Sequence, residues 1–414
     1  MTRPASAPAA VTDRWGVALA SAVSLAVAMG IGRFAFTPLL PMMLHDGVID
    51  LRSASWLASA NYLGYLAGAL LCTFQPWIWA RATRLPPIDG PWLVRAGLVA
   101  TAVLTLAMAL PLPRLWPLLR FAAGVASALV FVYTSGWCLS QLARLQATAL
   151  GGVMYAGPGA GIVVSGLFAS AMVAWHWQAS SGWLIFGALA FALTALVWRV
   201  FRAGSGPQPV AGARPGSTEA GGAHGRAEVA WLAIAYGLAG FGYIVTATFL
   251  PVIARASLPL SPWLDMFWPI FGLGVVTGSL LAARLRVSGD LRPMLIGSYC
   301  LQATGIAVSI VRPSLAGFAV GSLMLGLPFT AITFFAMQEV RRLRPALAAS
   351  FMGLLTAMYG IGQIVGPPLV AELLRHSDNA GAGFTHSLEI AMSALLAGAA
   401  IYLGMVRAYP VRRG

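Results

Sequence analysis

Two arginines lie deep inside apolar runs of this 414-residue sequence, and their position suggests chemistry more directly than that of any other residue type. Arg33 lies about nine residues from the far end of the first apolar run, and Arg120 about six residues into the fourth. If both runs cross a bilayer, both side chains lie at similar depth, roughly 9–14 Å in. A guanidinium at mid-membrane costs at least about 2.5–3.5 kcal/mol, so it should face a wet cavity or a partner. Two interpretations stay open: each arginine braces helices by donating to backbone carbonyls, or the pair binds an anionic solute.

Uncharged polar side chains also interrupt the apolar runs. Some of them should line a cavity with the arginines, while others pair with a neighbouring helix. Beside Arg33 and Arg120, we take Asn61, Tyr133 and Tyr243 as candidate substrate contacts. The other members of this set are Tyr62, Tyr155, Tyr236, Gln338 and Gln363.

The groups that most enzymes use are missing from the apolar runs. The carboxylates nearest to them lie at their ends and are expected at the surface: Asp265, Glu339, Glu372 and Glu389. No mid-run carboxylate offers an obvious proton carrier. The five histidines show no metal-ligand spacing. The three cysteines all lie inside apolar runs, and because their number is odd we expect buried free thiols rather than a set of disulfides. We therefore expect no catalytic residues, no metal and no cofactor, and we predict that the protein is not an enzyme.

Two glycine-rich runs resemble phosphate-binding loops only superficially. They are GPGAG at Gly157–Gly161 and GIGQIVG at Gly360–Gly366, and neither follows a strand or opens a βαβ unit. Glycine lets helices approach closely, and proline removes a helical hydrogen bond. We expect these runs to act in packing and bending, through Gly157, Pro158, Gly161, Gly360 and Gly362.

The composition indicates whether the apolar runs face water or lipid. The chain is 59% hydrophobic and 9% charged, with a mean hydropathy of +0.80, whereas soluble proteins carry about 25% charged residues. Much of the surface must therefore face lipid. A net charge of +14 could suggest a nucleic-acid partner, but the arginines form no extended basic face, so we exclude one.

Twelve runs are long enough to span a bilayer, which needs about 20 mostly apolar residues. Nineteen arginines fall on one side of these spans and five on the other, so the positive-inside rule places both termini in the cytoplasm. We expect an all-α, multi-pass protein of a bacterial inner membrane. The predicted spans are 15–43, 54–79, 91–112, 115–140, 149–173, 179–201, 229–254, 261–284, 291–311, 314–338, 346–373 and 386–408.

The chain divides into two similar halves. Residues 202–228 are rich in Gly, Pro and Ala without an apolar period, which is typical of a flexible linker. A shift of 210 residues superimposes Gly30 on Gly240 and Pro41 on Pro251, and a shift of 201 superimposes Gly161 on Gly362. We therefore predict six-helix bundles at 1–201 and 229–414, joined by a cytoplasmic linker at 202–228. Internal six-span repeats are typical of secondary transporters.

Three segments carry a family resemblance. GIGRFAFTPLLPMM, SASWLASANYLGYLAGALL and YGLAGFGYIVTATFLPVIAR together resemble the YbfB/YjiJ-type transporters of the major facilitator superfamily. The resemblance implies two pseudo-symmetric six-helix bundles around a cavity lined by spans 1, 4, 7 and 10. RFAAG (Arg120–Gly124) resembles the arginine motif of span 4, and GVMYAGPGAG (Gly152–Gly161) resembles the span 5 motif of antiporters. The loop WARATRLPPIDGPW lacks the usual Gly–Asp–Arg–Gly motif.

These observations predict a secondary active transporter of a small organic solute that works by alternating access. We expect an anionic or zwitterionic solute, a proton as the coupling ion, export as the direction, and a monomer within the lipid bilayer. Import of a small metabolite and a membrane sensor that kept the transporter fold are the alternatives. A primary pump would need a partner subunit, because no GxxxxGK motif is present.

Overall fold

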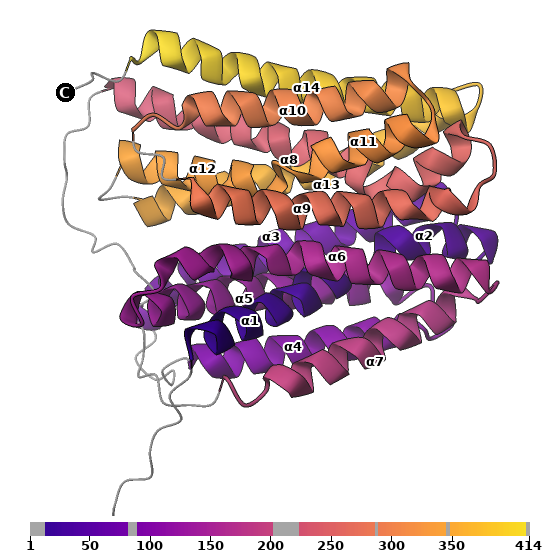
Figure 1. Ribbon diagram of the computed structural model, residues 1–414, viewed down its shortest axis with the longest axis horizontal. Helices are drawn as coiled ribbons and strands as arrows, with labels where there is room; N and C mark the ends of the chain where they lie inside the picture. Colours follow the sequence, from indigo (N-terminus) through magenta and orange to yellow (C-terminus); the bar gives the residue numbers. More distant parts are fainter. Residues whose placement is uncertain (1–12, 82–88, 202–222, 286–288, 345–347, 411–414) are drawn as a thin grey trace, which may run out of the picture.

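The computed structural model consists of helices that run roughly parallel to one another across the molecule (Figure 1). It describes residues 13–81, 89–201, 223–285, 289–344 and 348–410. Twelve stretches among these residues are long and apolar enough to cross a membrane, which confirms the predicted number of spans. The helices of the first half are α1 Arg14–Leu25, η1 Ala26–Ile31, α2 Phe36–His45, α3 Leu51–Arg81, α4 Gly90–Ala107, α5 Trp116–Arg144, η2 Thr148–Leu150, α6 Gly151–Ala174 and α7 Ala179–Val197. Those of the second half are α8 Ala223–Ser257, η3 Pro262–Met266, α9 Phe267–Arg284, α10 Arg292–Val311, α11 Leu315–Gly326, α12 Phe329–Leu343, α13 Ala348–Arg375 and α14 Ala380–Ala408.

Three spans are built from more than one helix, and span 8 is one of them, with the 3-10 helix η3 followed by α9. Span 1 consists of α1, the π-helical η1 and α2, and span 10 consists of α11 and α12. The last six residues of the predicted linker belong to α8, which begins at Ala223, and the rest of that linker lies outside the described residues. Residues 82–88 of the loop between spans 2 and 3 also lie outside them.

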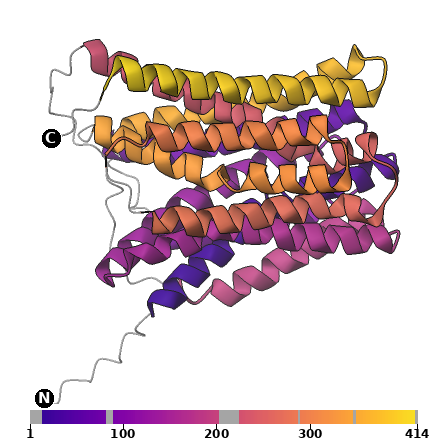
Figure 2. The same ribbon diagram turned by 45° about the horizontal axis from the view of Figure 1, so that its top comes forward.

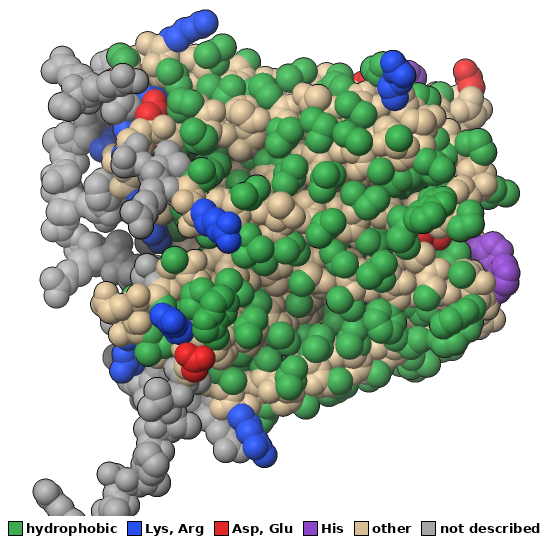
Figure 3. Space-filling view, in the orientation of Figure 1, with side chains coloured by type: hydrophobic (Ala, Val, Ile, Leu, Met, Phe, Trp, Pro, Cys, Tyr) green, Lys and Arg blue, Asp and Glu red, His purple; other side chains and the backbone are tan. Residues whose placement is uncertain are grey.

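The two halves form separate groups of helices in Figure 1, the first from indigo to magenta and the second from salmon to yellow. Both α1 and α14 have an end on the side that carries the chain termini, which we call the terminal end; Figure 2 shows the same arrangement from a second direction. We call the other side the distal end. Hydrophobic side chains cover the middle of the face drawn in Figure 3, and several arginines lie near its terminal end. An apolar belt between polar ends is what a bilayer requires.

Equivalent glycines make equivalent contacts in the two halves. A Cβ on Gly64 would lie 1.9 Å from the Phe121 carbonyl oxygen, and a Cβ on the equivalent Gly274 would lie 2.7 Å from that of Leu323. Spans 2 and 4 therefore touch in the first half as spans 8 and 10 do in the second. Because real side chains do not approach carbonyl oxygens so closely, glycine is required at both positions. The repeat read from the sequence thus corresponds to a structural repeat.

Span 1 is interrupted by a turn just before the sequence FTP (Phe36–Pro38), with which α2 begins. Pro38 has no N–H to donate to the Phe34 carbonyl, and its ring disfavours a continuous helix. The Thr37 N–H instead donates to the Phe34 oxygen at 3.1 Å, in a shorter turn. Residues 32–35 form a turn between η1 and α2, so the carbonyl oxygens of Gly32 and Arg33 become available to other donors.

Candidate functional site

Spans 1 and 7 meet where the two halves face each other. The Thr37 hydroxyl donates to the Ala247 carbonyl oxygen at 3.2 Å, and these residues are related by the same 210-residue shift as the glycines. Equivalent residues of two repeats touch only near the pseudo-two-fold axis between them. Arg33 and Tyr243 are also separated by 210 residues, so they too lie beside this axis.

A hydrogen-bonded chain links Arg33 to Tyr243 through Gln363 of α13. The Arg33 Nη2 donates to the Gln363 amide oxygen at 2.5 Å, and the Gln363 amide nitrogen donates to the Tyr243 hydroxyl. All three side chains are buried, with exposed fractions of 3% or less. Arg33 belongs to the first half and the other two to the second, so the chain crosses the space between the halves.

Aromatic rings surround the Arg33 guanidinium. Its central carbon lies 4.2 Å from the Tyr65 ring centroid, 5.2 Å from that of Tyr62 and 5.3 Å from that of Phe34. On the other half, Tyr359 stacks against Tyr243 with ring centroids 5.6 Å apart. Aromatic faces attract a cation but cannot neutralise its charge.

Arg120 has a different role from Arg33 in this structure. Its Nη1 donates to the Gly32 oxygen at 3.3 Å, and its Nη2 donates to the Arg33 oxygen at 3.2 Å. These are the two carbonyls that the interruption of span 1 makes available. Arg120 is buried and its guanidinium lies over the Phe36 ring, with the central carbon 4.8 Å from the centroid. Arg120 therefore holds the turn from which the Arg33 side chain projects. Its guanidinium contacts the backbone of Gly32 and Arg33 and does not face the space between the halves.

The other two candidate contacts lie apart from the Arg33 chain. Asn61 is fully buried and donates its amide to the Arg120 carbonyl oxygen at 2.9 Å, so it holds α3 against α5. Tyr133 follows Arg120 by 13 residues in α5, which is about 20 Å along a helix, and lies beside Gly90 at the start of α4. The structure thus brings Arg33 and Tyr243 together. Arg120 and Asn61 lie on the side of Arg33 that faces the interior of the first half, and Tyr133 lies farther along α5, beside the start of α4.

Further polar contacts join the two halves on the distal side of Arg33. The Tyr62 and Thr248 hydroxyls lie 2.9 Å apart, and the Ser59 hydroxyl donates to the Ile364 carbonyl oxygen at 2.9 Å. With the contact between Thr37 and Ala247, they hold spans 1 and 2 against spans 7 and 11. The structure is therefore closed between the halves at its distal end.

The predicted packing residues lie at close helix contacts. A Cβ on Gly157 would lie 2.1 Å from the Ala22 carbonyl oxygen, and one on Gly161 would lie 2.6 Å from that of Ala26, so α6 lies directly on span 1. In the second half, a Cβ on Gly362 would lie 2.3 Å from the Gly237 oxygen. Gly360 instead faces Leu66 across the two halves, and Pro158 is buried within α6.

A second charged group lies near the terminal end, wholly within the second half. Arg292 is fully buried, and its guanidinium contacts Glu228 at 3.0 Å, Asp290 at 2.8 Å and Glu339 at 3.7 Å. It also donates to the carbonyl oxygens of Met405 and Tyr409. Four parts of the chain therefore meet at one arginine: α8, the segment before α10, α12 and the end of α14.

Glu339 corrects a sequence-based expectation. We expected it at the helix surface, paired with Arg342, but its side chain is fully buried. The pair with Arg342 is present, and Glu339 also accepts a hydrogen bond from the Leu291 N–H at 3.2 Å. The expectation of a surface position was wrong because the segment before α10 folds over this end of α12 and excludes water.

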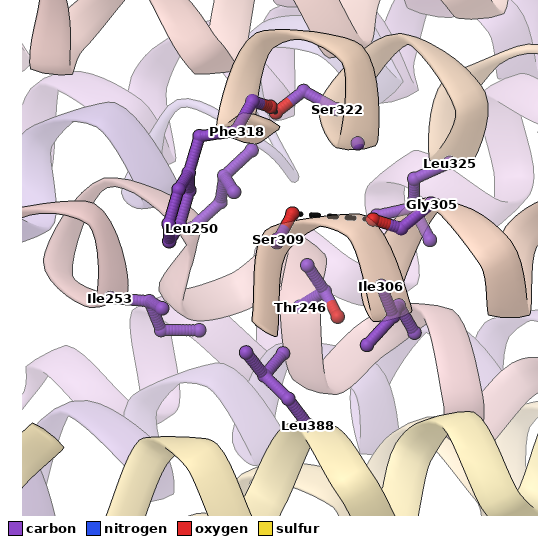
Figure 4. Close-up of a pocket in the computed structure, with 11 residues that line it drawn as sticks. Thr246, Leu250, Ile253, Gly305, Ile306, Ser309, Phe318, Ser322, Leu325 and Leu388 are labelled. Carbon is purple, nitrogen blue, oxygen red and sulfur yellow. Dashed lines mark hydrogen bonds between the residues drawn. The ribbon is translucent and has the colours of Figure 1, made fainter. Parts of the chain in front are cut away.

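A small cavity lies apart from Arg33, among α8, α10, α11 and α14 (Figure 4). Its walls are mostly apolar, with the hydroxyls of Thr246, Ser309 and Ser322 among them. Ser309 donates to the Gly305 oxygen at 3.2 Å, whereas the buried Thr246 hydroxyl has no hydrogen-bond partner in the described structure. No cluster of His, Cys, Asp or Glu able to hold a metal ion occurs among the described residues.

Comparison with known proteins agrees with this architecture. The profile of the family described as "Uncharacterised MFS-type transporter YbfB" matches residues 25–403, which is most of the chain. The chain belongs to this YbfB-type family of the major facilitator superfamily. The crystal structure of a mutant of the nucleoside transporter NupG is similar to it, with a TM-score of 0.68 and 14% identity. The similarity covers 94% of this chain and 99% of NupG, and at this identity it shows the fold. Curated protein sequences gave no significant match.

Membership of the YbfB-type family confirms the resemblance read from the sequence and the major facilitator fold. Gln363 was among the polar residues noted in the spans, but it was not chosen as a contact. The only signal for it in the sequence is an amide side chain between the glycines of span 11. Many residues that only support helix packing have the same surroundings.

Proposed function

We propose that this YbfB-type protein is a secondary active transporter that carries a small anionic organic solute by alternating access. The observation that carries the proposal is Arg33, a buried cation on the axis between the halves. None of the ion pairs among the described residues involves it. A planar guanidinium binds a carboxylate through two parallel hydrogen bonds. An anion at this position would complete the charge balance of the site.

The contacts between the halves suggest how access alternates. The distal end is closed by Thr37, Ser59 and Tyr62 of the first half, which bind partners on spans 7 and 11. These are single hydrogen bonds between preformed bundles, so they can break without unfolding either half. We propose that opening this seam exposes Arg33 to the distal side, and that its closure is the opposite step of the cycle. With the termini cytoplasmic, as the arginine distribution predicts, the seam lies on the outer side.

We further propose that the solute is exported in exchange for protons. The support is the resemblance of the Gly157–Gly161 run to an antiporter motif and the close packing of α6 on span 1 that it produces. Everted membrane vesicles with an imposed pH gradient test the direction. Solute accumulation driven by an acidic interior supports export, and accumulation only with the opposite gradient would contradict it.

An untargeted comparison of metabolites inside and outside cells, with and without the protein, identifies the solute. Transport is then measured for Arg33→Lys and Arg33→Ala at matched membrane expression, with Arg52→Ala as the control outside the bundle interior. Lysine keeps the charge but loses the two-pronged geometry, so we expect Arg33→Lys to weaken transport and Arg33→Ala to abolish it. Unchanged solute affinity in a well-expressed Arg33→Ala protein would end the proposal for this residue. Transport of cationic solutes alone would also end it.

A further inference from the structure

We propose that the Gln363 amide oxygen occupies the position of a carboxylate oxygen of a monoanionic solute, which binds Arg33 and Tyr243 by displacing Gln363. This inference rests on the proposed function and assigns both the class of solute and a residue that competes with it. It begins from the bridge across the two halves, where a neutral amide lies between a cation and a hydroxyl.

The geometry of Gln363 resembles that of a bound carboxylate in two respects. Its oxygen accepts from Arg33 Nη2 at 2.5 Å, as a carboxylate oxygen would. Its other terminal atom contacts the Tyr243 hydroxyl, which can donate to an oxygen as readily as it accepts from a nitrogen. A carboxylate in the same place would therefore satisfy Arg33 and Tyr243 together, without a change in either side chain.

The charge at Arg33 favours the replacement. A guanidinium has five N–H donors, and the Arg33 Nε is buried without a hydrogen-bond partner. Its acceptor, Gln363, is uncharged, and the rings of Tyr62 and Tyr65 provide only weak compensation. A carboxylate would supply the missing charge and a second acceptor, so it should compete with the amide although it must first lose water.

The number of charges restricts the solute further. Arg120, the other cation in this region, directs both of its Nη atoms to backbone carbonyls of span 1. One cation is thus available between the halves, which fits a single negative charge. The spans that meet at Arg33 place a carboxamide and tyrosines around it, and none of the described ion pairs brings a carboxylate there to receive an ammonium group. A monocarboxylate therefore fits better than a dicarboxylate or an amino acid.

Binding to the purified full-length protein tests the inference through thermal-shift titrations. The probes are acetate, lactate and benzoate as monoanions, succinate as a dianion and alanine as a zwitterion. The variants are Gln363→Leu, which removes the competing amide, and Gln363→Glu, which replaces it by a fixed carboxylate of the same shape. Gln302→Leu is the matched control, because Gln302 is a buried glutamine of α10 that donates to the Leu325 oxygen within the second half.

We expect at least one monoanion to bind the wild type more tightly than succinate and alanine. Gln363→Leu should bind the same monoanion about tenfold more tightly, since a hydrogen bond to a charged group no longer has to be broken. Gln363→Glu should lose binding at neutral pH, because its own carboxylate occupies Arg33 and Tyr243. Gln302→Leu should keep the wild-type affinity.

If Gln363 only supports the structure, Gln363→Leu should bind the monoanion more weakly than the wild type. Weaker binding in Gln363→Leu, with Gln302→Leu unchanged, would overturn the inference. If Gln363→Leu does not fold, Gln363→Glu decides: a folded Gln363→Glu protein that still binds the monoanion at neutral pH as tightly as the wild type would count against the inference. Failure of all three monoanions to bind the wild type would also overturn it. The metabolite comparison judges transport separately, so transport of another solute would leave the proposed function standing.

Discussion

The ion cluster around Arg292 allows the sharpest prediction about stability, because its charges can be counted. Two cations, Arg292 and Arg342, lie with three anions, Glu228, Asp290 and Glu339, so the formal sum is −1. Replacing Glu339 by glutamine changes the sum to 0. Replacing Arg292 by methionine changes it to −2 and leaves three carboxylates around an apolar side chain.

The expected costs follow from this difference. Removing one partner of a buried ion pair costs about 3–5 kcal/mol, because the remaining charge is buried without compensation. Arg292→Met should reach this range and also lose the hydrogen bonds to Met405 and Tyr409. Glu339→Gln keeps one acceptor for its neighbours and corrects the charge sum, so we expect a loss of about 1–3 kcal/mol. Glu372→Gln, in an exposed pair with Arg375, should change stability by less than about 0.5 kcal/mol.

Thermal unfolding of the purified variants measures the order of these effects. A dye that reacts with thiols reports unfolding, because Cys72 and Cys138 are buried as expected. The expectation was wrong for Cys300, which is exposed, so Cys300→Ser is used to remove its background signal. We expect melting temperatures to fall in the order Glu372→Gln, Glu339→Gln, Arg292→Met. If Glu339→Gln were as damaging as Arg292→Met, the charge count would be the wrong explanation for this cluster.

Three further predictions follow from individual residues. Gly161→Leu should abolish transport while the protein still inserts, since its side chain meets a carbonyl of span 1, whereas Gly404→Leu has open space and should be active; full activity of Gly161→Leu would contradict this packing role. Burial raises the pKa of Asp290, but the hydrogen bonds and charge of Arg292 outweigh it and leave the pKa below 3.8. The stability that Asp290 contributes is therefore constant above about pH 5 and lost as the pH falls below about 3.8. The difference in melting temperature between the wild type and Asp290→Asn should accordingly shrink only below about pH 3.8. Thr246→Val should raise stability by up to about 1 kcal/mol, because it removes a buried hydroxyl without a partner; a lower melting temperature would show that this hydroxyl binds something in the cavity.

The spans and the two halves could be predicted because they depend on properties that the sequence states directly. Twenty or so apolar residues must cross a bilayer as a helix, whatever their neighbours are. The glycine repeat was equally informative, since Gly64 and Gly274 each lie against a carbonyl oxygen of a neighbouring helix, where no larger side chain fits. Such constraints are local or periodic, so one sequence suffices to find them.

The roles of the two arginines could not be separated in this way. Arg33 and Arg120 were predicted at similar depth, and bracing and solute binding were both open for each of them. What separates them is the turn at 32–35, whose free carbonyls bind Arg120, and Gln363, which lies 330 residues away from Arg33. Likewise, Glu339 was expected at the surface because the approach of Leu291 and Arg292 cannot be read from spacing along α12.

The repeat explains why the candidate site is asymmetric. In two identical halves, Arg33 would face a second arginine across the axis, and two like charges in a medium of low dielectric would repel each other strongly. The second half instead has Tyr243 at the equivalent position, and Gln363 joins the two. The glycines that set helix spacing are kept in both halves, so the scaffold can remain nearly symmetric while the polar groups differ. Under the proposed alternating access, a single charge on the axis would be reached from whichever end of the bundle is open, as the proposed carrier of a monoanion requires.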